Sequence, residues 1–496
     1  MAILEDRGLF WWNDQAIPRK QFAPDSAVGG KLTIGDNGEA RLEMDTMMPG
    51  DKHPFEVLAG SGQPVARTIQ SLLRGDAGYV LLTELFQSGG RMRTSNLSHE
   101  GYLALNCLVS KSQFSPDNAK KDRRFRSVLV ELDGFEDWLW LQGIAVKRGA
   151  KRFTAKYKQP KNYQYDVDFG AVAIEYDLLG PAFSSNYERN VTLKQTAGVR
   201  ISPKDRPTLS TCQLFYQQLE ELLMLLTSSD RSLDWPTLVS ANGKQHAKLY
   251  FMRNRTDAKP PKAHECLINF PKIAPVFGDF LAKLIQKREE FGPGFYLYLG
   301  IRRGMKMFVE HRFVNLIWGL EAFDRRRRGD EQATPKLAQK ISRILKQVQA
   351  KKDHDWLQGK LKNAGEPSLA ERLYTIFSAL PIPFDKTGLQ KFCKDCADRR
   401  NDISHYGGIR HKGQKYDDFM RDTDKKADAL AGLYQLHLLS LIGVSKERLE
   451  FGTNQNWPMS KIERDLHAAG ALVQPAQAGS GVPSTGASPK SKAGSK

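Results

Sequence analysis

The sequence is poor in cysteine, has fewer acidic than basic residues, and has no long uninterrupted apolar run. Its 496 residues include 5 cysteines, too few to staple a chain of this length, so a reducing interior is expected. The longest apolar stretches, around residues 222–226 and 436–444, are far shorter than a membrane-spanning helix. The first residues carry acids and lack the apolar segment of a secretory signal. These absences predict a cytoplasmic protein that does not cross a membrane.

Three common catalytic signatures are also missing. The chain has no phosphate loop of the Gly-x-x-x-x-Gly-Lys type, no Gly-x-Ser-x-Gly turn and no His-Glu-x-x-His helix. The sequence therefore argues against a P-loop nucleotidase, an α/β-hydrolase and a zinc protease.

The balance of charge is strongly basic. Lysine and arginine number 74 against 56 acidic residues, a formal net charge of +18. This excess predicts attraction to polyanions that weakens as salt rises. Nucleic acid is the natural candidate and an anionic membrane the less favoured one, while a basic surface that only aids solubility is the alternative.

The first part of the chain reads as short strands separated by Gly, Pro, Asn and Asp. Residues 31–34 and 40–44 flank Gly35-Asp36-Asn37-Gly38, a pattern typical of a β-hairpin with a glycine-containing turn. An amphipathic helix is expected at residues 208–227. Strands at this spacing predict a sandwich-like or barrel-like β-rich region over residues 1–265. Further strands are expected at residues 79–86, 102–109, 126–132, 152–157, 171–176, 191–201 and 246–252.

Beyond residue 273 the pattern becomes helical. Short turns with Gly or Pro join the segments, as in an antiparallel bundle, which we expect over residues 274–472. The stretch 474–496 is rich in Gly, Ser, Ala and Pro and has lysines but no acids, which predicts a disordered basic tail. The predicted fold class is thus α+β, a β-rich region followed by an all-α bundle. Helices are expected at residues 275–290, 307–327, 335–350, 368–380, 386–405 and 415–442.

A fixed cation, an amide and an imidazole lie close together near the expected end of one helix. Arg400, Asn401 and His405 precede Gly407 and Gly408, which supply a plausible helix stop. An arginine can hold a phosphate through its planar fork of donors, and a histidine can exchange protons near neutral pH. The alternative is an ordinary surface helix end, where the histidine favours the negative end of the helix dipole.

Helical spacing places Arg400 in line with a buried face. One stripe of this helix is formed by Leu389, Phe392, Cys396, Arg400 and Ile403. On the earlier helix at 307–327, the apolar stripe continues into Glu321 and Asp324. A carboxylate on a core-facing stripe needs a charged or hydrogen-bonding partner, and Arg400 is the candidate partner for Glu321. In the alternative, the helix is rotated slightly and Glu321 stays in water.

These residues carry a resemblance to a known family. The pattern from Arg400 to His405, an arginine followed by a polar residue and then by a histidine, resembles the signature of HEPN domains. The Leu320-Glu321-Ala322 helix and the long helix after the motif resemble the ApeA-like branch. Residues 8–12 (Gly-Leu-Phe-Trp-Trp) and 130–139 resemble the ApeA N-terminal domain.

The resemblance implies a metal-independent endoribonuclease without a cofactor that acts in abortive infection against phage. It also implies a homodimer in which two copies of the motif form one composite site. In that setting His405 would be the general base or acid and Arg400 would bind the scissile phosphate. Asn401 would orient either group and Glu321 would hold Arg400. RNA is the implied substrate, with tRNA as one candidate, and a phage-derived trigger would act through the N-terminal region.

Several basic residues surround the motif and are candidates for RNA contacts. A run of four arginines follows the Glu321 helix, and further cations flank the motif itself. A solvated helix face is the alternative for such runs. The candidates are Arg325, Arg326, Arg327, Arg328, Arg399, Arg410 and Lys412.

Cys393 and Cys396 form a Cys-x-x-Cys pair just before the motif. A zinc site would need two more ligands, and the nearest candidates lie far upstream, so we expect small buried helix residues and no metal. The competing interpretation for the whole region is a non-catalytic module that uses Arg400 and His405 only to bind RNA or to assemble.

Overall fold

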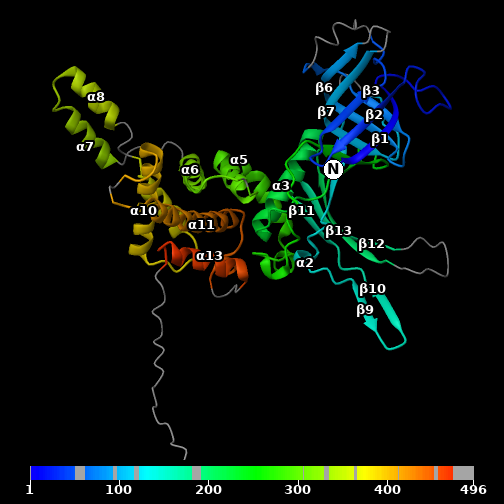
Figure 1. Ribbon diagram of the computed structural model, residues 1–496. Coiled ribbons are helices and arrows are strands. Elements are labelled where there is room, and N and C mark those ends of the chain that lie inside the picture. The colour runs from blue at the N-terminus through cyan, green and yellow to red at the C-terminus, as the bar shows by residue number, and fades with distance from the viewer. Residues whose placement is uncertain are drawn as a thin grey trace, which may run out of the picture.

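The computed structural model places a β-rich region and a helical region side by side, joined through α3 and α5 (Figure 1). The predicted basic tail at 474–496 lies outside the residues that the structure describes. The described residues are 2–50, 62–92, 98–116, 122–180, 192–304, 306–328, 335–361, 366–410, 413–451 and 456–472.

Thirteen strands form one antiparallel sheet that curls on itself. Its order is β11-β12-β13-β8-β14-β15-β7-β3-β2-β1-β5-β6-β4, and β6 also pairs with β7. That second pairing closes β7, β3, β2, β1, β5 and β6 into a barrel, and closure removes the exposed edges of those strands. The strands are β1 (Ala2–Trp12), β2 (Val28–Gly35), β3 (Ala40–Met44), β4 (Pro64–Val65), β5 (Ile69–Leu73), β6 (Tyr79–Met92), β7 (Ser98–Ser110), β8 (Phe125–Glu131), β11 (Tyr163–Val167), β12 (Gly170–Leu179), β13 (Lys194–Pro203), β14 (Thr237–Ser240) and β15 (His246–Phe251).

The barrel forms because its strands alternate between buried and exposed side chains. In β3, Ala40, Leu42 and Met44 are buried while the residues between them face solvent. The predicted hairpin is confirmed, since β2 and β3 pair in register across Gly35 to Gly38. Phe10 and Trp12 of β1 fill the same interior. The predicted α+β class with a β-rich N-terminal region is therefore confirmed, and its closed part is a barrel.

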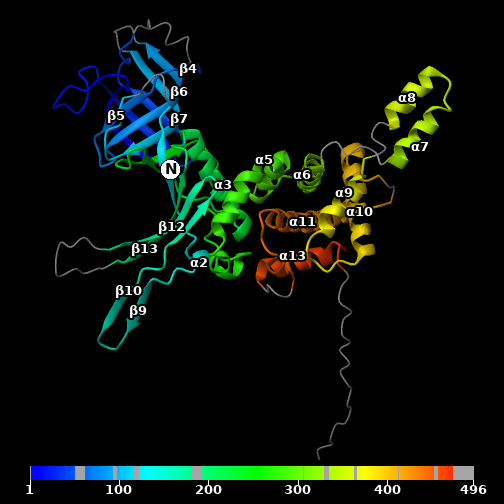
Figure 2. The same ribbon diagram turned by 180° about the vertical axis from the view of Figure 1, so that it is seen from behind.

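One hairpin stands apart from the sheet. Strands β9 (Ile144–Arg148) and β10 (Phe153–Tyr157) pair only with each other among the described strands. Figures 1 and 2 show this hairpin extending away from the body of the protein.

Helices make up the rest of the chain and agree with the predicted segments in most places. Helix α3 begins after Thr208, whose side-chain oxygen accepts a hydrogen bond from the Thr211 N–H and so caps the helix. The segments around α8, α12 and α13 were not predicted as helices. The helices are α2 (Glu136–Leu139), α3 (Leu209–Thr227), η1 (Ala263–Glu265), α4 (Phe270–Ile273), α5 (Phe277–Arg302), α6 (Val309–Arg328), α7 (Pro335–Leu345), α8 (Lys351–Leu361), α9 (Leu369–Ser378), α10 (Lys386–Tyr406), α11 (Tyr416–Leu441), α12 (Lys446–Leu449) and α13 (Trp457–Ala468).

Helix α5 runs twelve residues past its predicted end at 290, through a kink. Gly292 has φ of 59°, which is a left-handed conformation that glycine accepts easily, and Pro293 follows it. After the kink, Gly294 lies against the backbone of Gly319 in α6, where an added Cβ would approach the Gly319 carbonyl oxygen to 2.3 Å. The kink thus lets α5 and α6 pack with their backbones in close contact.

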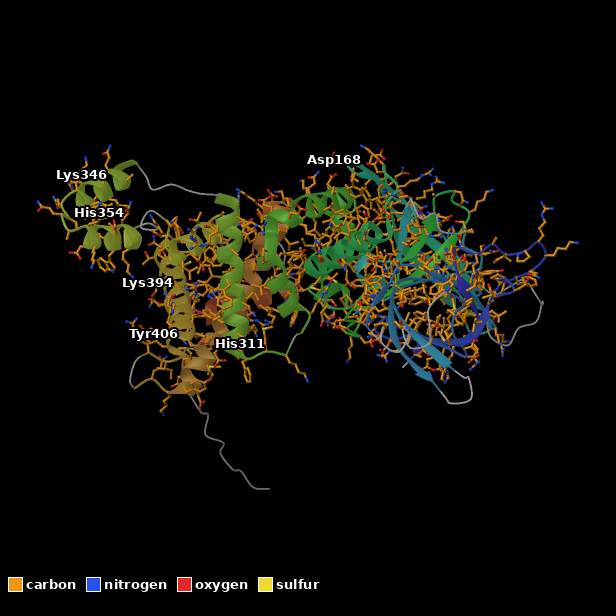
Figure 3. All side chains as sticks on the ribbon, turned by 90° about the horizontal axis from the view of Figure 1, so that it is seen from above. Asp168, His311, Lys346, His354, Lys394 and Tyr406 are labelled. Carbon is orange, nitrogen blue, oxygen red and sulfur yellow. The ribbon has the colours of Figure 1, made fainter. Side chains whose placement is uncertain are left out.

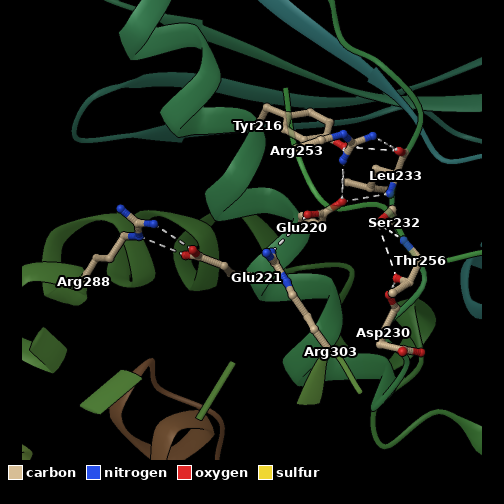
Figure 4. A network of polar contacts seen from close by, with 10 residues as sticks. All are labelled: Tyr216, Glu220, Glu221, Asp230, Ser232, Leu233, Arg253, Thr256, Arg288 and Arg303. Carbon is tan, nitrogen blue, oxygen red and sulfur yellow. Dashed lines mark hydrogen bonds and ion pairs between the residues drawn. The ribbon is translucent and has the colours of Figure 1, made fainter. Parts of the chain in front are cut away.

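Buried ion pairs tie α3 to α5 and to the sheet (Figure 4). Glu221 accepts two hydrogen bonds from Arg288 of α5, at 3.0 and 2.7 Å. Its neighbour Glu220 accepts from Arg303, just after α5, at 3.1 Å and from Arg253, just after β15, at 2.9 Å. Burial raises the pKa of Glu221, and the Arg288 guanidinium opposes that rise. Two successive acids on one helix therefore hold the β-rich and helical regions together.

Among the described residues, no helix is both long enough and apolar enough to cross a bilayer. The boundaries 1–265 and 274–472 remain predictions.

Candidate active site

Helix α10 carries the central residues and is fixed at both ends. Its N-cap Asp385 accepts a hydrogen bond from the Gly388 N–H at 2.6 Å. At the other end Gly407 has φ of 67°, and its N–H bonds to the Ile403 carbonyl at 3.2 Å. The Gly408 N–H bonds to the carbonyl of Asp402 at 3.3 Å. The predicted helix stop is therefore confirmed.

The predicted stripe is also confirmed. Leu389, Phe392 and Cys396 are buried, and Ile403 packs against the same core. Arg400 lies at the border of that core, with 21% of its side chain exposed.

Arg400 and Glu321 meet across the α6–α10 contact. The Arg400 Nη2 donates to Glu321 Oε2 at 2.9 Å, and 16% of the Glu321 side chain is exposed. The expected pairing of these two residues is thus observed. A charge-assisted bond of this kind orients the guanidinium and leaves part of its fork free for a ligand.

The pair belongs to a chain of alternating charges. Glu321 also accepts from Arg325 at 3.2 Å, and Arg325 donates in turn to Glu366. Arg372 of α9 donates to Glu366 at 3.2 Å and to the buried Asp324 of α6 at 2.9 Å. Arg400 is therefore held at one end of a continuous network that spans α6, α9 and α10.

Arg372 and Glu366 were missed by sequence reasoning. The signal for Arg372 was its position on the apolar stripe of α9, in line with Leu369 and Ile376. The same criterion had selected Arg400. Glu366 lies in the loop before α9 and carries no comparable signal.

Asn401 and His405 lie about one helical turn apart and share a face of α10. The Asn401 Oδ1 accepts from Arg400 Nη1 at 3.0 Å. The His405 side chain is exposed, and none of the described residues forms a hydrogen bond or ion pair with it. Figure 3 shows its neighbour Tyr406 at the outer edge of the helical region, so the motif opens to solvent.

Arg400 and His405 lie five residues apart on α10. Residues five apart on an α-helix are rotated by about 140° and displaced by about 7.5 Å along the axis. The two side chains therefore leave the helix in different directions, although the long Arg400 side chain reaches Asn401, on the face that carries His405, at 3.0 Å.

Arg399 makes a different set of contacts from its neighbour. Its Nη1 donates to the Phe419 carbonyl at 2.8 Å and to the Thr423 hydroxyl at 2.9 Å, and its Nη2 pairs with Asp422. The guanidinium also stacks over the Phe419 ring at 4.1 Å. These contacts favour a structural tie between α10 and α11, and the predicted RNA contact of Arg399 stays a prediction.

The other predicted RNA contacts are distributed around the motif. Arg326 and Arg327 are exposed on the last turns of α6, while Arg325 is engaged in the network. Arg410 is exposed and stacks over the Tyr406 ring at 5.1 Å. The side chain of Arg328 and the whole of Lys412 lie outside the described part of the chain.

Both cysteines of the Cys-x-x-Cys pair are buried in α10 and unpaired. Burial raises the pKa of Cys393 to about 12 and that of Cys396 well above its ordinary value. Both are therefore thiols at neutral pH, as expected for small core residues. In the described part of the chain, no cluster of three His, Cys, Asp or Glu side chains is placed to bind a metal ion.

A buried histidine lies behind the site. His437 of α11 packs edge-on against Phe323 of α6, with 5.2 Å between the ring centroids. Burial lowers the pKa of His437 to about 4, helped by the positive charge of Arg327 and opposed by Asp324. The imidazole is therefore neutral when the protein is folded at neutral pH.

A helical bundle in which an inward carboxylate holds an arginine, with an exposed histidine five residues later at the helix end, has the arrangement of the HEPN class. Comparison with known families agrees. Residues 314–448 match the Apea-like HEPN family, and residues 6–284 match ApeA N-terminal domain 1. The chain therefore belongs to the ApeA-like HEPN family.

A search of curated proteins and a search of solved structures each returned no match. HEPN domains are in general ribonuclease-like and often dimerise. Membership of this family supports a function of the HEPN nuclease type with a role in defence.

Proposed function

We propose that this protein is a metal-independent endoribonuclease of an anti-phage abortive-infection system that cleaves cytoplasmic RNA, with tRNA as one candidate. The observation that carries the proposal is the Arg400–Glu321 pair at 2.9 Å, followed in the next turn by the exposed His405. A guanidinium held in place and an imidazole open to solvent are the two groups that RNA cleavage without a metal requires.

The chemistry assigns one task to each group. His405 removes the proton from a ribose 2′-hydroxyl, and the resulting oxygen attacks the adjacent phosphorus. The bond from phosphorus to the 5′-oxygen breaks, and an imidazolium protonates that leaving oxygen. Arg400 stabilises the extra negative charge on the phosphate as the transition state forms. The products are a 2′,3′-cyclic phosphate and a 5′-hydroxyl.

The remaining site residues act through these two. Glu321 holds the Arg400 guanidinium, and Asn401 bridges Arg400 and the face that carries His405. Because HEPN domains often dimerise, we infer a homodimer in which each site takes its arginine from one copy and its histidine from the other.

Cleavage of labelled RNA in EDTA tests the proposal. The wild-type protein should release cyclic-phosphate ends, and Arg400→Ala and His405→Ala should each lower the rate at least about a hundredfold. Arg343→Ala and His354→Ala remove an exposed arginine from α7 and a partly exposed histidine from α8 and should leave the rate unchanged.

A 2′-deoxy substrate must stay intact, since it has no nucleophile. Cutting that persists in the Arg400 and His405 variants, or on the deoxy substrate, would refute the mechanism. Retained RNA binding without cutting, with toxicity on overexpression also absent, would favour a non-catalytic binding or assembly module.

A further inference from the structure

The hairpin β9–β10 has an unusual distribution of charge. Residues 138–165 contain no aspartate or glutamate. Within the described residues, none of the hairpin cations forms an ion pair with a carboxylate. All are exposed: Lys147, Arg148, Lys151, Arg152, Lys156, Lys158 and Lys161.

The strand register divides the hairpin into two different faces. Lys147 pairs with Thr154, and Lys156 pairs with Ala145, so these side chains lie on one face. The Gly149 N–H bonds to the Arg152 carbonyl at 2.7 Å, and the Lys158 N–H bonds to the Gly143 carbonyl at 2.8 Å. Continued alternation places Arg152 and Lys158 on this same face, which we call the basic face.

The opposite face carries apolar and aromatic side chains together with one cation, Arg148. Phe153 pairs with Arg148, and Ala155 pairs with Val146. The Phe153 side chain is 69% exposed and that of Val146 is 56% exposed, so within the described part of the chain neither is covered. Among the described large apolar side chains, few are as accessible as Phe153.

The fold itself gives no reason for this composition. A two-stranded hairpin on its own is only marginally stable, so the hairpin depends on its attachment at the base. There the Gly143 N–H donates to Gln195 Oε1 at 3.0 Å, and Gln159 Nε2 donates to the Tyr176 carbonyl at 3.3 Å. Neither the exposed Phe153 nor the cations contribute to these anchors.

We propose that the β9–β10 hairpin is a binding arm for single-stranded nucleic acid. The strand passes around the edge of the hairpin, so that the basic face contacts its phosphodiester backbone while Phe153, on the opposite face, stacks on an unpaired base beside the Arg148 guanidinium. Cations that follow a backbone together with an accessible aromatic ring are the features by which proteins bind single strands without a fixed sequence. The proposal concerns the β-rich region and does not depend on RNA cleavage by the helical region.

An anionic membrane is the less favoured partner. A hairpin that enters a bilayer surface presents apolar residues at its tip, whereas the tip here carries Lys151 and the cations extend along both strands. RNA and DNA share the backbone chemistry that the arm recognises, and the experiment separates them.

Fluorescence anisotropy of labelled 20-nucleotide strands tests the arm. Every protein carries His405→Ala, so that bound RNA stays intact and binding alone is measured. The arm variant, K147Q/R152Q/K156Q/K158Q, changes four basic-face cations to glutamine. A second variant is Phe153→Ser. A matched control removes the same charge from four exposed cations dispersed over the β-rich region, R19Q/K20Q/K244Q/K259Q.

The arm variant should bind single-stranded RNA or DNA at least about tenfold more weakly than the control, with a salt dependence reduced by about three counterions. Phe153→Ser should weaken binding about five- to hundredfold. If the affinities for RNA and DNA fall equally, the arm recognises the phosphates and the bases. If the affinity for RNA falls more, the arm also recognises the 2′-hydroxyl.

An arm variant that binds both strands as tightly as the control would overturn the proposal. So would an arm variant that loses binding only to phosphatidylserine vesicles or only to duplexes. Circular dichroism and the melting temperature should match those of the wild type for both variants, because all changed side chains are exposed.

Discussion

The ion pair between Glu321 and Arg400 allows a sharp test of how the arginine is positioned. In Glu321→Gln the side chain keeps its shape but loses the charge that holds Arg400 and Arg325. The side chains of Arg400 and Glu321 are 21% and 16% exposed. The stability lost when this pair is broken should therefore lie between that of a surface ion pair and that of a buried one. We expect the free energy of unfolding to fall by about 2 kcal/mol.

The kinetic effect should appear in kcat and not in KM. A guanidinium without its carboxylate still attracts RNA, so KM should stay the same or fall slightly. The guanidinium is no longer held where negative charge develops in the transition state. We therefore expect kcat to fall about ten- to thirtyfold, which corresponds to an activation free energy higher by about 1.4 to 2 kcal/mol. Glu321→Asp, which restores the charge on a shorter side chain, should recover part of that loss.

Glu366→Gln is the matched control. It removes the other carboxylate that holds Arg325, together with one contact of Arg372, but leaves the contact between Glu321 and Arg400 in place. It should cost comparable stability and leave kcat near the wild-type value. If both variants lowered kcat equally, the network would act only through stability, and the positioning role of Glu321 would be wrong.

Three further expectations concern assembly, acidity and the junction between regions. Mixing Arg400→Ala with His405→Ala protein should restore roughly a quarter of wild-type cleavage if two equivalent sites form in trans in a twofold dimer, and none if each site forms within one chain. Between about pH 6.5 and pH 4, His437 takes up a proton in the unfolded chain but not in the folded one. The free energy of unfolding should therefore fall by about 3 kcal/mol as the pH is lowered through this range. Urea denaturation at several pH values measures this fall, and the His437→Leu variant should not show it. Glu221→Gln should lower the free energy of unfolding by about 3 kcal/mol by leaving Arg288 unpaired, whereas Glu221→Leu with Arg288→Met should recover most of it in the same assay.

Much of the fold could be predicted from local patterns, whereas the pairings between strands distant in the sequence could not. The β2–β3 hairpin and α10 are specified by adjacent residues, through the turn at Gly35 to Gly38 and the stop at Gly407. Closure of the barrel depends on β6 and β7 pairing over their whole length, which no short pattern encodes. The second half of α5 was missed because Gly292 and Pro293 indicate a helix end, whereas the structure uses them for a kink.

The site was predicted where one rule sufficed. A charged residue on an apolar stripe needs a partner, and this rule joined Glu321 to Arg400. Applied to α9, the rule would also have found Arg372, which reaches Asp324. The partners of Arg399 lie on α11 and depend on how two helices cross, so its exposure could not be judged from its own helix.

The two adjacent acids on α3 have a consequence for how the molecule can be divided. The match to the ApeA N-terminal domain ends at residue 284, inside α5, whereas Arg288 lies further along this helix and Arg303 directly after it. A fragment that started near residue 274 would keep these arginines and lose Glu220 and Glu221. A fragment that ended near residue 274 would keep the two carboxylates but lose Arg288 and Arg303, with which they pair. The β-rich and helical regions therefore share a single folding unit at this helix, and a partner that stabilises one should raise the melting temperature of both.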